Sequence, residues 1–140
     1  MDNIIPSFNI LIILLAAAAY WLLGALWYSM ITGNVWSNEL TKHGVTLPEP
    51  TRQQLVRKLF LSFILNVIIA FGVAVILWFI GSAGMDEGII LGLIIGLSFS
   101  AATIGLTYSW ENRSFKLFLV DAGYHVIGIT LCAVILSMWM

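Results

Sequence analysis

Four long stretches almost free of formal charge constrain the fold of this sequence more than any other feature. No charged residue occurs between Asp2 and Glu39, and none occurs between Lys58 and Asp86. A helix needs about 20 apolar residues to cross the hydrocarbon core of a bilayer. The sequence therefore predicts an all-α integral membrane protein, a four-transmembrane-helix bundle that forms one membrane domain over residues 1–140. The predicted spans are residues 8–31, 59–80, 88–110 and 117–139.

The composition indicates a lipid bilayer as the surroundings of the chain. Hydrophobic residues make up 61% of it and charged residues only 9%, whereas about a quarter of the residues in soluble domains are charged. The net charge is -1, so nucleic acid is not expected as a partner. The single cysteine, Cys132, lies in an apolar run and is expected to serve in packing, because a disulfide within the chain needs a second thiol.

All the basic residues fall on one side of the predicted bundle. Four lie in or beside the loop of residues 32–57, two lie between the third and fourth spans, and the middle hairpin has none. They are Lys42, Arg52, Arg57, Lys58, Arg113 and Lys116. The positive-inside rule assigns this side to the cytoplasm. We therefore expect residues 32–57 to form a cytoplasmic loop and both termini to lie on the non-cytoplasmic side.

The cytoplasmic loop contains two local signals. Thr51 followed three residues later by Gln54 is a capping box, so the second helix is expected to begin directly after this threonine and to project beyond the lipid. Residues 35–40 form a short amphipathic piece that is expected at the membrane interface. Trp36 in this piece and Tyr28 before it are expected to be aromatic anchors at that interface.

Small residues repeat at four-residue intervals along the third span. The repeat consists of Gly88, Gly92, Gly96 and Ser100, and regular helical geometry adds Thr103 and Thr107 to the same stripe. Small residues at this spacing let two membrane helices approach until their backbones touch. Packing within the chain is the leading interpretation of the stripe. A self-association face and a backbone-lined pathway are the alternatives.

The fourth span contains two ionisable residues, Asp121 and His125, which are four positions apart and so share one helix face. Counting about 1.5 Å per residue from Leu117 places them roughly 6 and 12 Å into the hydrocarbon core. An ionisable side chain at that depth is costly unless it is paired, hydrated or protonated, which makes it a candidate for function. The same counting brings Tyr20, Asn66, Thr103, Thr107 and Tyr124 into one polar layer with this pair.

Two interpretations of this layer stay open, and the first is a substrate or proton site in a small cavity open to the cytoplasm. Its mouth would carry Glu111, Asn112, Arg113 and Lys116. The structural alternative is that Asp121 pairs with Arg113 or His125, while the tyrosines and Asn66 hydrogen-bond one another between helices. Neither a metal nor a cofactor is expected, because Asp121 and His125 supply only two ligands.

Two separated motifs carry a family resemblance. The first is Gly24 to Ser29 (GALWYS) with Trp36 shortly after it, and the second is Glu111 to Ser114 (ENRS) ahead of Asp121 to His125 (DAGYH). Over nearly the whole chain they resemble a bacterial membrane-protein family, domain of unknown function 1761. The resemblance implies a short four-span protein of the bacterial inner membrane and no assigned activity. Met30 stands where the family pattern has a proline, so the turn that closes the first span is expected to differ here.

The leading functional hypothesis is a transporter-like or channel-like protein that binds a proton or a small polar solute at Asp121 and His125. A chain this short leaves little room for a pathway, so a homo-oligomer is expected. One alternative is a membrane-embedded enzyme acting on a lipid or thiol cosubstrate, with Tyr124 or His125 as the acid or base. It is less expected, because no serine or cysteine lies one turn from His125 in the fourth span. The other alternative is a structural or accessory subunit of a membrane complex.

Overall fold

The computed structural model describes residues 8–81 and 84–139, and every regular element in that part of the chain is helical. The elements are α1 (Ile10–Leu26), η1 (Trp27–Ile31), α2 (Gly33–Lys42), α3 (Arg52–Ile80), α4 (Met85–Ile95), η2 (Gly96–Ala101), α5 (Ala102–Trp110) and α6 (Phe115–Trp139). The segments η1 and η2 are π-helical turns that continue their neighbours. Four helices long and apolar enough to cross a membrane result: Ile10–Ile31, Arg52–Ile80, Met85–Trp110 and Phe115–Trp139. The predicted four-helix membrane fold is confirmed.

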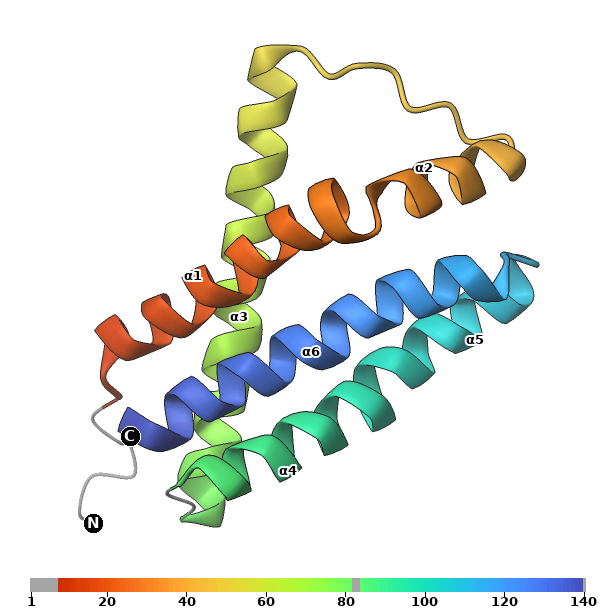
Figure 1. Ribbon diagram of the computed structural model, residues 1–140. Coiled ribbons are helices and arrows are strands. Elements are labelled where there is room, and N and C mark those ends of the chain that lie inside the picture. Colours follow the sequence, from red (N-terminus) through yellow and green to blue (C-terminus); the bar gives the residue numbers. More distant parts are fainter. Residues whose placement is uncertain (1–7, 82–83, 140) are drawn as a thin grey trace.

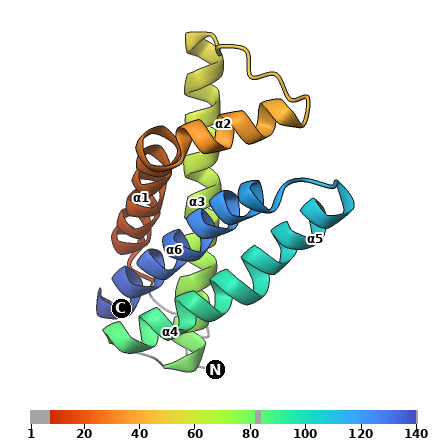
Figure 2. The same cartoon turned by 45° about the vertical axis from the view of Figure 1, so that its right-hand side comes forward.

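Helix α6 holds the bundle together (Figure 1). Helix α1 packs along one side of it, and the continuous helix α4–η2–α5 packs along another, both antiparallel to α6. Helix α3 crosses α1 and α6, and its N-terminal half stands well away from α5 in both views (Figures 1 and 2). The end of the bundle with α2, the start of α3 and the α5–α6 turn is called the basic end below. It carries Lys42, Arg52, Arg57, Lys58, Arg113 and Lys116.

The glycine stripe of the third long helix packs directly against α6. A Cβ atom added at Gly92 would lie 2.4 Å from the Cα of Thr130, and one added at Gly96 would lie 2.9 Å from the Cα of Val126. Only glycine lets two backbones approach so closely. Packing within the chain, the leading interpretation of this stripe, is therefore confirmed. The homo-oligomer stays a prediction, and its interface would have to use a face other than this glycine stripe.

The expected continuation of this stripe to Thr103 and Thr107 is wrong. The π-helical turn η2 lies between the glycines and α5, and its i→i+5 hydrogen bonds make it wider than an α-helical turn. The helix faces before and after η2 therefore fall out of register. Thr103 and Thr107 are exposed and line a cleft, while Gly105 faces α6, where an added Cβ would lie 3.3 Å from the Phe118 ring.

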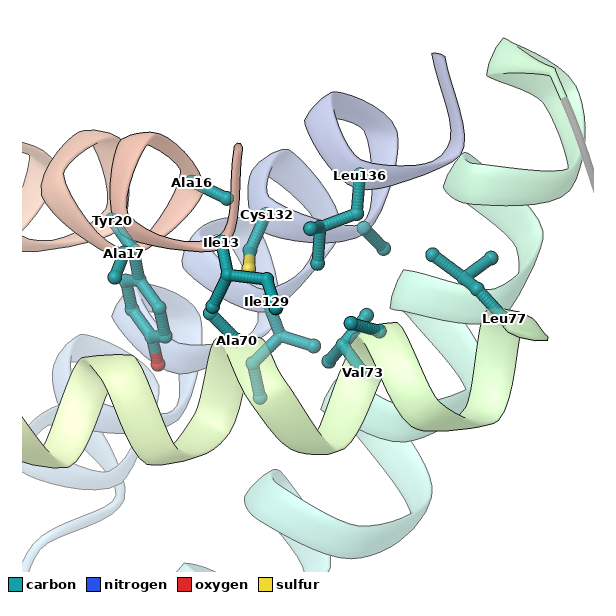
Figure 3. Close-up of a cluster of buried hydrophobic side chains, with 12 residues drawn as sticks. Ile13, Ala16, Ala17, Tyr20, Ala70, Val73, Leu77, Ile129, Cys132 and Leu136 are labelled. Atoms are coloured by element: carbon teal, nitrogen blue, oxygen red, sulfur yellow. The ribbon is translucent and has the colours of Figure 1, made fainter. Parts of the chain in front are cut away.

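Apolar packing closes the half of the bundle that lies away from the basic end. The buried cluster joins side chains from α1, α3 and α6 (Figure 3). It consists of Ile13, Ala16, Ala17, Tyr20, Ala70, Val73, Ala74, Leu77, Ile129, Cys132, Ala133 and Leu136. Cys132 has no exposed surface, in agreement with its expected packing role. Tyr20 is also fully buried and lies at the polar boundary of the cluster.

The capping box at the start of α3 is present as predicted. The Gln54 backbone N–H donates to Thr51 Oγ1 over 3.3 Å, and the Thr51 N–H donates to Gln54 Oε1 over 3.0 Å. Two of the otherwise unpaired donors of the first turn are thereby satisfied. The helix begins at Arg52, so its first turns carry Arg52, Arg57 and Lys58.

Candidate functional site

An open cleft of about 880 Å³ lies at the basic end, between the N-terminal part of α3 and helix α5, with α6 at its base. Its lining comes from η1, α2, α3, α5, the α5–α6 turn and α6. The lining residues are Tyr28, Trp36, Leu40, Leu55, Lys58, Leu59, Ser62, Thr103, Ile104, Thr107, Tyr108, Arg113, Asp121 and His125. Ligand pockets typically measure about 300 to 1,000 Å³ and are mostly apolar with a few polar groups. The cleft matches both criteria.

Asp121 connects three helices at the base of the cleft. Its Oδ1 accepts a hydrogen bond of 2.7 Å from the Tyr28 hydroxyl of η1, and its Oδ2 accepts one from the Tyr108 hydroxyl of α5. No cationic side chain in residues 8–81 and 84–139 lies within 4.0 Å of this carboxylate. The expected alternative in which Asp121 pairs with Arg113 or His125 is therefore wrong. Hydroxyl donors stabilise the carboxylate without neutralising its charge.

His125 lies one helical turn beyond Asp121 and connects the cleft with the buried interior. Its Nδ1 is 2.6 Å from the hydroxyl of Tyr20. Tyr124 packs between these groups, with its ring centroid 5.2 Å from that of Tyr20 and 5.3 Å from that of Tyr28. Asn66 of α3 is buried near Tyr124, with 5% of its surface exposed. An aromatic and amide layer therefore supports the two ionisable residues from behind.

The structure separates the predicted site residues into three groups. Asp121, His125, Thr103 and Thr107 line the cleft, as does Arg113 from the predicted mouth. Tyr20, Asn66 and Tyr124 lie behind them and contribute contacts only. Glu111, Asn112 and Lys116 are exposed and do not line the cleft, although Glu111 holds Arg113 through an ion pair. The guanidinium of Arg113 is also 5.1 Å from the centre of the Tyr108 ring.

Sequence reasoning missed the tyrosines that hold Asp121. Tyr28 was assigned to the interfacial aromatic belt along with Trp36, yet both line the cleft, and their ring centroids are 5.5 Å apart. Tyr108 follows the threonine stripe by one position and comes to the cleft because η2 shifts the register. The usable signal is chemical: a buried carboxylate needs donors, and tyrosines at the same depth are the available ones.

Helix α2 closes the cleft near the start of α6. The Ser114 backbone N–H donates to His43 Nε2 over 3.0 Å, directly before α6 begins. Glu39 is 6% exposed, and the hydrogen bonds from Lys42 and Ser114 hold the pKa of its carboxyl below the usual value. These contacts fix α2, the predicted amphipathic piece, so that Trp36 and Leu40 form one wall of the cleft.

The chemistry available at this site is that of a carboxylate, an imidazole and several phenols. Among residues 8–81 and 84–139, no group of three or more His, Cys, Asp or Glu side chains is placed to hold a metal ion. The carboxylate can bind a cationic group, and the imidazole can donate or accept hydrogen bonds. Lys58 and Arg113 add positive charge on the walls of the cleft.

Comparison with known proteins agrees with the resemblance carried by the two motifs. A family model described as "Protein of unknown function (DUF1761)" matches residues 11–137, a range that contains every residue of the cleft. No curated protein and no solved structure matches the chain. The length of the family match and the four apolar helices lead to one conclusion. The chain is a multi-pass membrane protein and belongs to the DUF1761 family, whose function is unknown.

Proposed function

We propose that this protein is transporter-like, and that its cleft takes up a proton or a small polar solute at Asp121. One observation carries the proposal: a carboxylate inside a membrane-spanning helix lies at the base of an open cleft, and among the described residues its partners are two hydroxyls and no cation. Ionisable groups inside membrane spans mark substrate and proton pathways. A bound proton or an amine-like group of a solute supplies the positive charge that Asp121 lacks.

Binding at Asp121 would act on the helices through its two tyrosine partners. Tyr28 and Tyr108 belong to η1 and α5 and donate to the same carboxylate. A proton or solute donor on either oxygen competes with one of these hydroxyls, so its arrival loosens the link from α6 to η1 or α5. The turns η1 and η2 are π-helical, and such turns are frequent at functional sites.

The apolar cluster around Cys132 and Leu136 supports a site that is open toward one side at a time. It fills the half of the bundle opposite the basic end, so among the described residues apolar packing follows directly beyond Tyr20 and His125. Transport then requires α1 or the α4–η2–α5 helix to move relative to α6. Alternating access of this kind is common among small transporters with sites near the middle of the membrane.

A flux assay on the purified protein in liposomes tests the proposal. We expect a proton gradient or one member of a panel of small cationic solutes to give flux, measured with a pH-sensitive dye or labelled solute. Asp121→Asn with His125→Ala should reduce this flux about 10- to 100-fold, because it removes a charge-assisted hydrogen bond. Asp86→Asn is the matched control, since this exposed acid lies at the opposite end in α4. Flux that is unchanged in the double variant contradicts the proposal.

The proposed orientation places the basic end in the cytoplasm of a bacterial cell, with the cleft facing inward and both termini outside. The six basic residues gathered at that end support it. In a Cys132→Ala background, Asp86→Cys is expected to react with a membrane-impermeant maleimide on intact cells, whereas Lys42→Cys reacts only after permeabilisation. The reverse pattern would place the cleft on the outer side. Labelling of both sites in intact cells would indicate dual topology.

A further inference from the structure

We propose that the outer face of α1 and α3 is a binding site for one anionic phospholipid, with the phosphate at Arg52 and Arg57 and an acyl chain in the groove beside them. Two hollows on this face carry the inference, and they meet. The site shares Leu59 with the cleft, but Arg52 and Arg57, which would hold the phosphate, do not line the cleft. Its failure and the failure of the proposed transport function are therefore distinguishable.

The first hollow has the chemistry of a phosphate site. It measures about 560 Å³ and is lined by Arg52, Gln53, Val56, Arg57 and Phe60. Helix α3 contains no acidic residue, and in residues 8–81 and 84–139 no carboxylate pairs with either arginine within 4.0 Å. Guanidinium groups bind phosphate oxygens through two parallel hydrogen bonds. Both arginines are exposed at the end of a membrane helix, the depth at which lipid headgroups lie.

The second hollow has the shape and polarity of an acyl-chain groove. It measures about 450 Å³ and lies between Ala18, Trp21 and Leu22 of α1 and Val56, Leu59, Phe60 and Phe63 of α3. The indole N–H of Trp21 donates to Ser62 Oγ over 3.0 Å, so the groove wall presents no unpaired indole donor.

The two hollows share Val56 and Phe60, so they form one continuous surface. The helical rise from Arg52 to Phe63 is about 16 Å, at about 1.5 Å per residue. Half of a bilayer measures about 20 Å including its headgroups. One phospholipid molecule in its normal orientation therefore fits the surface, with the phosphate at the arginines and the chain along the phenylalanines. Charge and length together favour a lipid over a free phosphate.

Lipid binding to the purified full-length chain in neutral detergent tests the proposal. Native mass spectrometry is expected to show one tightly bound phosphatidylglycerol, while phosphatidylcholine with the same acyl chains binds more weakly. Arg52→Gln with Arg57→Gln should weaken phosphatidylglycerol binding about 30-fold, from the loss of two interfacial charges. Leu22→Trp, at a position 55% exposed, fills the groove and should also weaken binding while both arginines remain.

Lys116→Gln is the matched control, since it removes an exposed charge at the same end of the bundle but outside both hollows. This variant should bind phosphatidylglycerol as the native chain does. Glycerol phosphate, which has the headgroup phosphate and no acyl chain, should not displace the lipid. Three results would overturn the proposal: undiminished binding by the double arginine variant, equal affinity for phosphatidylcholine, or an equal loss with Lys116→Gln.

Discussion

A single methyl group added by Gly92→Ala is expected to lower the free energy of unfolding by about 1 to 3 kcal/mol, the usual cost of overpacking. The new Cβ would lie 2.4 Å from the Cα of Thr130 and 3.1 Å from its backbone nitrogen. Backbone atoms in the middle of a helix have no alternative rotamer, so α4 and α6 have to move apart. Separation also disturbs the neighbouring contacts, where Gly88 faces Val134 and Gly96 faces Val126.

The measurement is equilibrium or thermal unfolding of the purified protein in one detergent, compared with Gly72→Ala. Gly72 lies within α3, and an added Cβ there meets nothing within 4 Å. This control should be neutral or slightly stabilising, because alanine is favoured over glycine in a helix interior. Equal effects of the two substitutions would contradict the close packing of α4 on α6.

The helices and their caps were accessible from the sequence because local signals determine them. Long apolar stretches with little formal charge set the four long helices, and Thr51 with Gln54 sets the start of α3. The close-packing face of α4 was accessible too, since glycines at four-residue spacing indicate a close helix contact, although the spacing alone left open whether the partner lay within the chain. In each case the information lies within a few residues of the position that it determines.

The partners of Asp121 were not accessible, because one depends on a contact between distant segments of the chain and the other on a π-helical turn. Tyr28 lies 93 residues from Asp121 and reaches it only because η1 ends α1 beside α6. Tyr108 reaches the same carboxylate because η2 turns α5 relative to α4. A regular 100° helical period contains no π-helical turn, so it extended the packing face to Thr103, whereas counting by depth placed the same residue in the polar layer.

Gly128→Ala is expected to disturb both the core and the candidate site, since the new Cβ would lie 2.0 Å from Cε2 of the Tyr20 ring. Tyr20 has no exposed surface, and Ile13, Ala16 and Ala17 pack in the same cluster, so the ring has no free space to enter. Its displacement breaks the 2.6 Å contact with His125 Nδ1. We expect a loss of about 1 to 3 kcal/mol in unfolding free energy, together with weaker uptake at the cleft.

Gly123→Ala on the same helix is the comparison with a smaller expected loss. Its Cβ would lie 3.3 Å from a carbon of the Trp27 ring, and a small shift of this ring is enough to relieve the contact. A double-mutant cycle with Tyr20→Leu separates the contact from general damage. Tyr20→Leu removes the ring that the new methyl group meets. The loss of unfolding free energy in the double variant should therefore be smaller than the sum of the two single losses, by a coupling energy of about 0.5 to 3 kcal/mol. Strictly additive losses would show that Gly128 and Tyr20 do not touch, and the proposed connection from the core to His125 would lose its basis.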